Sequence, residues 1–312
     1  MLKFILRRLA MLIPVLLGVS FLVFTIMSLT PGDPVEMYLG DNYTHEAHAA
    51  MTHELGLDKP FFVRYLNYIG NAVQGNFGIS YSTHQPVLAE IEARFPSTVI
   101  LAISALIFAI VLGVLLGTIS AAKQYSAFDS ASTFAALIGV SMPNFWLGLM
   151  LIIVFAAGLG WFPSSEFSGV KSLVLPAIAL GTNSLAIITR MTRSSLLETI
   201  RQDYIRTARA KGVKEYKVII KHALRNAMIP IITISGLQFG FAISGAVVVE
   251  TVFSWPGIGR LLVETIKLKD MPVVLAIVLI IAVSFTVINL IADILYAFFD
   301  PRIRAQYKTK KV

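Results

Sequence analysis

Six long apolar stretches, separated by blocks of charge, constrain the fold of this 312-residue chain more than any other feature. Only 14% of its residues are charged, whereas a soluble chain carries about 25%. A helix needs about 20 mostly apolar residues to cross a bilayer. The stretches that meet this requirement are residues 9–29, 99–121, 132–160, 173–189, 227–249 and 273–299. The sequence therefore predicts an all-α polytopic membrane protein with six transmembrane helices.

The positions of Lys and Arg predict the orientation of these helices. The first stretch follows Lys3, Arg7 and Arg8, and at about 21 residues it is longer than the core of a signal peptide, so we expect it to remain as a span. Lys and Arg also concentrate in 190–226 and 301–312, and such residues accumulate in cytoplasmic loops. Both termini are therefore expected in the cytoplasm. The same distribution accounts for the net charge of +8, so we expect contact with membrane lipid and not with nucleic acid.

The chain is expected to divide into four segments. They are the cytoplasmic N-terminus and first span at 1–29, an extracytoplasmic insertion at 30–97, the transmembrane core at 98–300 with a cytoplasmic loop at 190–226, and a basic tail at 301–312. The insertion has an amphipathic pattern at 61–73 and is expected to form a cap or collar over the membrane portion. A second outer segment, 251–272, combines an interfacial turn at Trp255 with an amphipathic stretch at 258–266.

Several motifs of catalysis and ligand binding do not occur in the sequence. It has no G-x-x-x-x-G-K-[ST] phosphate loop, no H-E-x-x-H and no G-x-S-x-G, and it has no cysteine. We therefore expect no catalytic residue and no cofactor bound by this chain. His45 and His48 have an i, i+3 spacing that suits a transition metal, but we favour solvated surface histidines and expect no metal site.

Five residues in the predicted spans are candidates for a gate or a translocation pathway. Pro143 removes a backbone hydrogen bond and should kink the third span. Gly236, Gly240 and Ser244 form a small-residue ridge on the fifth span, which suits a subunit interface or the lining of a pathway. Asp293 is the one clearly ionisable residue in a span; it is a candidate ion or proton site, with a carboxylate bonded near the interface as the alternative.

The segment from Arg190 to Arg225 is the most basic part of the chain. It carries ten Lys or Arg residues against three carboxylates, so it cannot lie in hydrocarbon and is expected to be a loop on one side of the membrane. Its helical spacing, with Gly212 in the middle, predicts a short helix, a turn and a second helix. This arrangement indicates a docking element, with a loop that only enforces topology as the alternative.

Residues 203–212 (DYIRTARAKG) and 222–230 (HALRNAMIP) resemble the cytoplasmic loop of permease subunits of bacterial ATP-binding-cassette importers. The loop motif of that family is commonly written E-A-A-x3-G-x9-I-x-L-P. When the motif is anchored on Gly212, the chain departs from it at four positions, with Arg206 for Glu, Thr207 for the first Ala, His222 for Ile and Arg225 for Pro. The variant is similar to the form in the dipeptide, oligopeptide, glutathione and nickel branch. Other landmarks that agree with this branch are 30–34 (TPGDP), 55–60 (LGLDKP), 75–78 (GNFG), 253–257 (FSWPG) and 300–304 (DPRIR).

The resemblance implies a type I importer permease in a bacterial inner membrane, working with several partners. These would be a second homologous permease subunit, two cytoplasmic ATP-binding subunits that carry ATP and Mg, and an extracytoplasmic solute-binding protein. The short helix would seat Ala208, Ala210 and Val213 in a groove of one ATPase, while basic side chains pair with acidic groups at its rim. The residues implied in this coupling are Tyr204, Arg206, Thr207, Ala208, Arg209, Ala210, Lys211, Gly212 and Val213.

The cargo is the least constrained part of this interpretation. The amino-acid sequence of the loop favours di- and oligopeptides as cargo, with glutathione next and nickel or a metal chelate third. An ion-coupled secondary carrier, which would depend on Asp293, is the alternative from another class. The expected function is therefore ATP-driven uptake of peptides, with ATP hydrolysis on the partner subunits and none on this chain.

Overall fold

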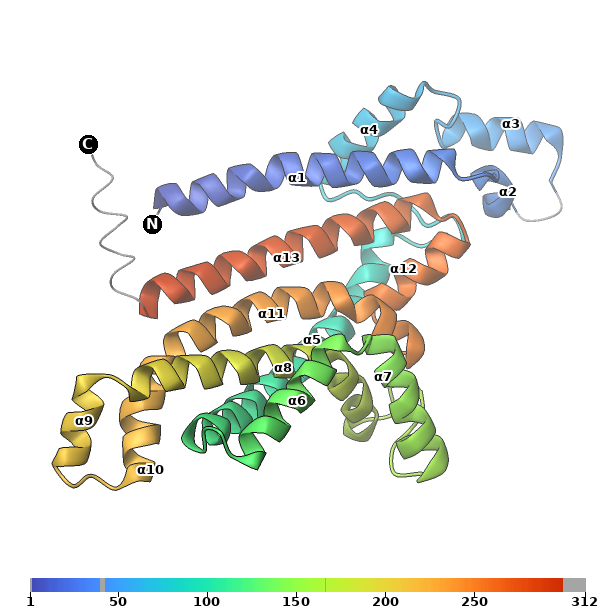
Figure 1. Cartoon of the computed structure of the whole chain (residues 1–312). Coiled ribbons are helices and arrows are strands. Elements are labelled where there is room, and N and C mark those ends of the chain that lie inside the picture. The colour runs from blue at the N-terminus through green and yellow to red at the C-terminus, as the bar shows by residue number, and fades with distance from the viewer. Residues whose placement is uncertain (1, 40–42, 166, 300–312) are drawn as a thin grey trace. The chain divides into compact units, whose positions relative to one another are not determined.

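A computed structural model of the chain describes residues 2–39, 43–165 and 167–299 (Figure 1). Within these ranges the regular structure is helical, without a β-strand, and an isolated antiparallel bridge joins Ile79 and Pro86. Five of the described helices are long and apolar enough to cross a membrane, and a bent pair of shorter helices provides a sixth crossing if it counts as one span. The prediction of an all-α protein with several membrane spans is confirmed.

The chain divides into two compact units. One comprises residues 2–98 and 256–284, and the other comprises residues 99–255 and the chain from Phe285. Two long helices, α5 (Val87–Ala122) and α13 (Met271–Phe299), contribute to both units. We refer to the first as the insertion unit, because it holds most of the polar segment between the first two spans, and to the second as the core unit.

The insertion unit contains α1 (Leu2–Leu29), α2 (Pro34–Leu39), α3 (His45–Glu54), α4 (Phe61–Val73), α12 (Ile258–Lys267) and the first parts of α5 and α13. The bounds of α4 and α12 confirm the predicted amphipathic stretches. Apolar faces meet in two clusters, one around Phe24, Tyr65 and Leu275 and the other around Val87 and Ile258. Amphipathic helices of this length are stable only when their apolar faces are buried in this way.

A buried carboxylate also holds the insertion unit together. Asp270 is fully buried before α13 and accepts hydrogen bonds from Ser80 Oγ at 2.6 Å, Ser82 Oγ at 2.9 Å and the Ser82 amide at 3.1 Å. These three donors offset the cost of removing a charged oxygen from water. The segment that follows α4 is therefore fixed to the start of α13 by hydrogen bonds as well as by apolar contacts.

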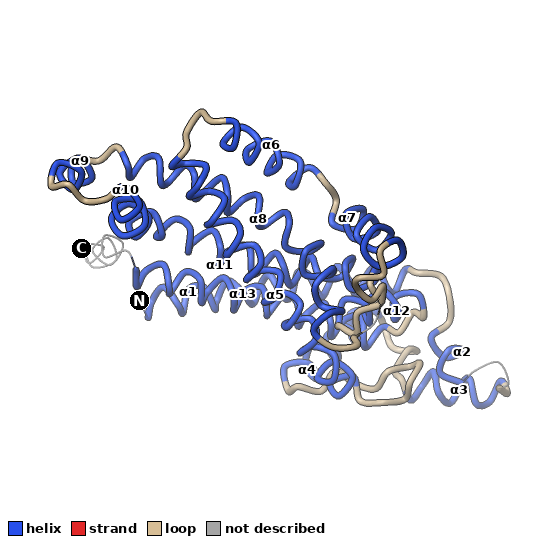
Figure 2. The backbone as a smooth tube through the Cα atoms, turned by 90° about the horizontal axis from the view of Figure 1, so that it is seen from below, coloured by secondary structure: helices blue, strands red, loops and turns tan. Residues whose placement is uncertain are grey.

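The core unit contains the helices that surround the basic segment. They are α6 (Ala127–Ser141), α7 (Asn144–Leu151), η1 (Ile152–Gly158), α8 (Val170–Ile200), α9 (Asp203–Ala210), α10 (Glu215–Lys217), η2 (Val218–Leu224) and α11 (Arg225–Val252). Figure 2 shows α8 and α11 running side by side. η1 and η2 are π-helical segments. Such segments are rare in proteins as a whole, and those that occur are often found at functional sites.

Glycines let α5 lie unusually close to α8 in the core unit. A Cβ atom added at Gly117 would lie 2.6 Å from the Thr189 carbonyl, and one at Gly181 would lie 2.6 Å from the Ala105 carbonyl. No side chain larger than hydrogen fits at these two positions without moving a backbone. The two helices therefore form a closely fitted pair, as small-residue ridges allow in membranes.

At three places the observed helices differ from the predicted stretches. The third span is not one kinked helix, because α6 ends at Ser141, α7 begins at Asn144, and the two parts are bent by 106°. The helix that holds the second apolar stretch begins earlier, at Val87, because residues 87–98 continue the same helix ahead of that stretch. The fourth helix runs on to Ile200, so the first third of the predicted loop at 190–226 is helix, continued beyond the apolar stretch that limited the prediction.

Candidate functional site

The basic segment folds into a helical hairpin between the C-terminal end of α8 and the N-terminal end of α11 (Figure 1). α9 ends where the Gly212 amide donates to the Arg209 carbonyl at 2.9 Å and the Val213 amide donates to the Ala208 carbonyl at 3.3 Å. Gly212 has φ +73°, a left-handed conformation that costs other residues about 1–2 kcal/mol. The predicted helix, turn and helix around Gly212 are confirmed, although α10 is only one turn long before the chain enters η2.

The inner face of the hairpin belongs to the hydrophobic core of the core unit. Ile205 and Val218 are fully buried and Ala208 is 9% exposed. They lie in one cluster with Leu196 of α8 and Ile231 of α11. We expected Ala208 to face outward, toward an ATPase, and this expectation is wrong. The helical period that exposes Arg206 and Arg209 turns Ala208 toward the protein. Movement of the hairpin is thus tied by contact to both long helices.

Two polar contacts hold the hairpin closed. Arg209 donates from Nη2 to Glu215 Oε1 at 2.6 Å and from Nε to Oε2 at 3.1 Å, so a bidentate ion pair spans the turn. This hydrogen bonding raises the pKa of Arg209. Asn226 of α11 donates to the Tyr204 hydroxyl at 2.7 Å. Of the predicted coupling residues, Tyr204 and Arg209 are therefore engaged with the chain itself.

The outer face of the hairpin carries exposed positive charge. The Arg206 side chain is 75% exposed, and its contact with Asp203 at 3.5 Å involves a carboxylate that is 96% exposed. Lys211 and Lys214 are exposed and form no ion pair with a described residue. Thr207, Ala210 and Gly212 are also exposed, whereas Val213 packs against the inner cluster. The surface offered to solvent is therefore basic, with small residues between the cations.

A second ion pair lies in the same unit as the hairpin and is largely buried. Arg193 of α8 donates to both carboxylate oxygens of Asp129 of α6, from Nε at 2.6 Å and from Nη2 at 2.7 Å. Ser120 Oγ and the Tyr125 amide also donate to Asp129, whose side chain is 5% exposed. The sequence pointed to Asp293 as the one clear ionisable group in a span, and the pair was missed because α8 extends beyond its apolar stretch.

The pathway candidates on α11 do not face one common space. Gly236 packs against α13, since a Cβ atom there would lie 2.5 Å from the Ala292 Cβ atom. A Cβ atom added at Gly240 would likewise lie 3.2 Å from the Phe285 ring of α13. The exposed Ser244 hydroxyl donates to the Gly240 carbonyl at 3.4 Å. The two glycines of the ridge are therefore covered by a helix of the same chain, and Gly236 also borders a cavity.

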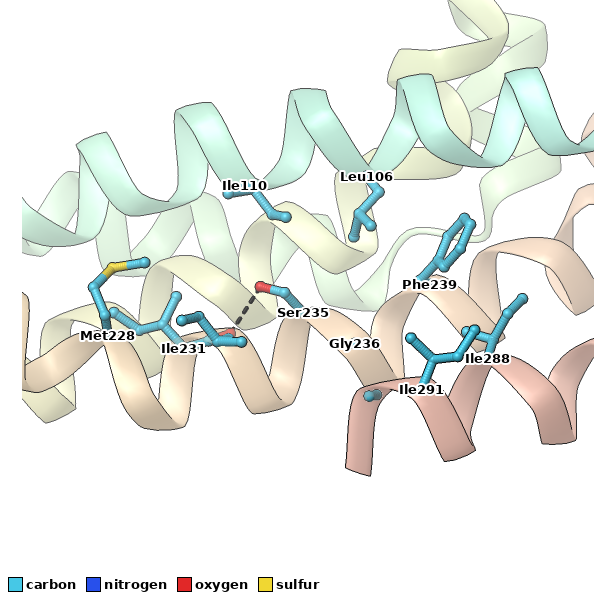
Figure 3. Close-up of a pocket in the computed structure, with 11 residues that line it drawn as sticks. Leu106, Ile110, Met228, Ile231, Ser235, Gly236, Phe239, Ile288 and Ile291 are labelled. Atoms are coloured by element: carbon cyan, nitrogen blue, oxygen red, sulfur yellow. Dashed lines mark hydrogen bonds between the residues drawn. The ribbon is translucent and has the colours of Figure 1, made fainter. Parts of the chain in front are cut away.

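That cavity is apolar (Figure 3). It has a volume of about 280 Å³ and lies among α5, α11 and α13. Figure 3 shows Leu106, Phe239 and Ile288 around it, and its single lining hydroxyl, that of Ser235, donates to the Ile231 carbonyl at 2.8 Å. Such a lining leaves polar groups of a solute without partners. By itself this cavity is therefore unsuited to hold a charged or peptide-like solute.

Pro143 borders a different cavity, of about 490 Å³, formed with Leu137, Trp146 and neighbouring residues at the break between α6 and α7. Pro143 itself is the N-terminal cap of α7, with φ −62° and ψ 135°. The side chain of Asp293 lies outside the described residues. The structure thus brings the predicted coupling residues together in one hairpin, whereas the described pathway candidates remain dispersed.

The outer histidines contact protein groups. His48 Nε2 lies 2.7 Å from Asp33 Oδ2, and His53 lies 3.9 Å from Asp58. Burial works to raise the pKa of Asp33, but hydrogen bonds from the Val35 amide and from His48 lower it below its ordinary value. Among the described residues no group of three or more His, Asp or Glu side chains is placed to hold a metal ion.

Known proteins resemble this chain along nearly its whole length. Residues 113–305 match the family described as "Binding-protein-dependent transport system inner membrane component", and residues 1–102 match the N-terminal family of the same kind of membrane component. The di/tripeptide transport system permease protein DppB of Pseudomonas aeruginosa (strain UCBPP-PA14) is 45% identical over 98% of this chain and 100% of its own. The glutathione transport system permease protein GsiC of Escherichia coli (strain K12) is 43% identical over 97% of this chain and 99% of its own.

The fold also has a counterpart among solved structures. The inward-facing MetNI methionine ABC transporter superposes with a TM-score of 0.59, at 16% sequence identity, over 69% of this chain and 98% of its own. At that level of identity the likeness concerns the arrangement of helices alone.

Proposed function

We propose a function for this chain from the premise that it belongs to the family of binding-protein-dependent transport system inner-membrane components. As a member of that family it is a multi-pass translocation subunit of the inner membrane and not an enzyme. The finer proposal is that it imports short peptides, with ATP and Mg held by two partner ATPase subunits. A second permease subunit and an extracytoplasmic solute-binding protein complete the assembly.

One observation carries the coupling part of this proposal. The hairpin of α9 and α10 has an inner face buried among α8 and α11 and an outer face of exposed cations around Gly212. An acidic rim on an ATPase subunit would attract Arg206, Lys211 and Lys214, while small exposed residues such as Ala210 allow close approach. Because Ile205 and Ala208 are embedded in the core, a displacement of the hairpin would move both long helices.

The choice of peptides as cargo is supported by the relatives. The Pseudomonas protein carries a di/tripeptide designation and the E. coli protein a glutathione designation, so both designations name short peptides. Nickel or a metal chelate has less support, because among the described residues no cluster of three or more His, Asp or Glu side chains could hold a metal ion. We therefore place peptides first and glutathione second.

The coupling role is tested by removing charge from the outer face only. We expect the triple variant Arg206→Ala, Lys211→Ala and Lys214→Ala to keep its fold, because these side chains are exposed and their contacts with the rest of the chain are few. Reconstituted with its partner permease, ATPases and peptide-loaded binding protein, it should lose peptide-stimulated ATP hydrolysis and peptide uptake. The matched control is Lys171→Ala with Lys267→Ala, which removes exposed lysines from the predicted outer segments.

The outcomes separate the coupling role from the alternatives. Normal uptake by the triple variant, or by a chain lacking residues 207–213, would contradict coupling through the hairpin. Uptake driven by an ion gradient without ATPases, and abolished by Asp293→Asn, would instead support a secondary carrier. A screen of binding proteins loaded with peptide, glutathione or nickel chelate, with ATPase stimulation as the readout, identifies the cargo.

A further inference from the structure

The insertion unit contains a polar cavity that the coupling and pathway candidates do not use. It has a volume of about 530 Å³, within the range of about 300–1,000 Å³ that is usual for ligand pockets. α3 and α4, which lie near each other in Figure 1, supply its walls together with residues 76–81 and the start of α13. Its lining combines charges of both signs, three asparagines and several aromatic rings.

One wall presents a cation, Arg64, that forms no ion pair with a carboxylate of the described residues. The Arg64 side chain is half-buried and its guanidinium lies 5.8 Å from the centre of the Phe24 ring. Among the described residues no carboxylate forms an ion pair with Arg64. A guanidinium held against an aromatic ring is partly desolvated and correctly oriented in advance, so it can bind a carboxylate with little loss of side-chain freedom.

A second donor lies one turn further along α4. Tyr68 lines the same cavity, and its hydroxyl is buried without a hydrogen-bond partner among the described residues. A buried hydroxyl that makes no hydrogen bond is costly in a native protein. An anionic oxygen placed beside Arg64 would accept a hydrogen bond from Tyr68 as well, because residues four apart lie on the same helix face. Two observations at one place thus point to a carboxylate.

The remaining polar groups suit an extended peptide. Asn67 and Asn71 continue the stripe that Arg64 and Tyr68 begin on α4, and both side chains line the cavity without a hydrogen bond to a described residue. Their amides offer a donor and an acceptor each to peptide groups. The stripe is about 10 Å long at 1.5 Å per residue, which corresponds to about three extended residues. Glu54, contributed by α3, supplies negative charge for an amino group.

We propose that this cavity is a receiving site for short peptides, in which Arg64 and Tyr68 bind the C-terminal carboxylate and Asn67 and Asn71 bind peptide groups. The proposal rests on the peptide-import function above and adds a second site, on this chain, to the one expected on the binding protein. The charge pattern selects zwitterionic solutes of two or three residues. A peptide with an amidated C-terminus lacks the carboxylate and should bind weakly.

The test measures coupling between the peptide carboxylate and Arg64. The reconstituted transporter in nanodiscs, without binding protein, is titrated with a radiolabelled tripeptide and with its C-terminal amide. In the unaltered protein the free acid should bind about ten-fold or more tightly than the amide, as expected for hydrogen bonds to a charged group. Arg64→Gln should remove this difference, and Tyr68→Phe should reduce it. Lys267→Gln, an exposed lysine of the same unit that does not line the cavity, is the matched control.

The outcomes distinguish this inference from the proposed function. If the unaltered transporter takes up the tripeptide but Arg64→Gln still prefers acid over amide, the receiving site is refuted and peptide import stands. If the tripeptide binds only when the binding protein is present, and the free acid and the amide then bind equally well, the inference is again refuted. Absence of peptide uptake by the unaltered, complete transporter refutes the proposed function itself.

Discussion

Replacing Arg193 with methionine should destabilise the core unit more than any exposed substitution. The Arg193 guanidinium makes two hydrogen bonds of 2.6 and 2.7 Å to Asp129, whose side chain is 5% exposed. Breaking a buried pair from one side costs about 3–5 kcal/mol, because the other charge stays buried. We expect the lower end, about 3 kcal/mol, since Ser120 and the Tyr125 amide still donate to Asp129.

The reciprocal change should cost less. Asp129→Asn leaves Arg193 with a side chain that is 27% exposed, so water can solvate part of the guanidinium, and we expect about 1–3 kcal/mol. The double variant should cost less than the sum of the two, with an interaction free energy of about 1–2 kcal/mol. In the Arg193→Met variant, methionine conserves much of the length of the arginine side chain, so the packing around position 193 is largely retained.

The assay is the free energy of unfolding of the purified chain in mixed micelles, followed by helical circular dichroism as SDS is increased. Arg201→Met is the control, because Arg201 caps α8 at an exposed position and surface changes stay within about 0.5 kcal/mol. If the two single costs add within about 0.5 kcal/mol in the double variant, the ion pair contributes nothing specific and the reasoning fails.

Three further predictions follow. Gly212→Ala should cost about 1–2 kcal/mol through backbone strain, since no atom lies within 4 Å of its added Cβ; Gly212→Asn should cost less, and equal costs by SDS titration would contradict this. Gly236→Val should destabilise by about 1–3 kcal/mol through overpacking, whereas Gly18→Ala, where the added atom meets nothing, should not; equal thermal shifts would rule it out. Because the pKa of Asp33 is lowered in the folded protein, its contribution is present above the unfolded value of about 3.9 and is lost as pH falls through the folded value; Asp33→Asn and His48→Gln should flatten the stability profile below pH 4.

Sequence reasoning predicted well where apolar period and length decide the structure. α4 and α12 were found with nearly their observed bounds because their apolar residues recur at helical spacing. The turn at Gly212 was found because only glycine readily adopts its φ value. The break at Pro143 was underestimated as a kink, since a local rule gives the loss of one hydrogen bond but not the 106° angle that the packing of α7 selects.

The polar contacts were largely beyond the sequence. Asp129 and Arg193 lie 64 positions apart, and neither residue has a local pattern that identifies the other. Asp270 and its serine donors are 188 and 190 positions apart. The amphipathic pattern predicted the helix that carries Arg64, Tyr68 and Asn71. Their proposed role in binding a peptide depends on a cavity that only the three-dimensional packing creates.

The π-helical segment η2 sets the rotational phase of α11. Its hydrogen bonds reach one residue further than those of an α-helix, so the chain winds less over residues 218–224 than it would in a regular helix at about 100° per residue. If η2 were α-helical, every later residue of α11 would rotate about the helix axis, and Gly236 and Gly240 would no longer face α13. η2 therefore fixes, by the winding of seven residues, which side of α11 is shown to its neighbour when the hairpin is held in one position. η2 thereby links the position of the hairpin, which we propose contacts an ATPase subunit, to the face of α11 that packs on α13.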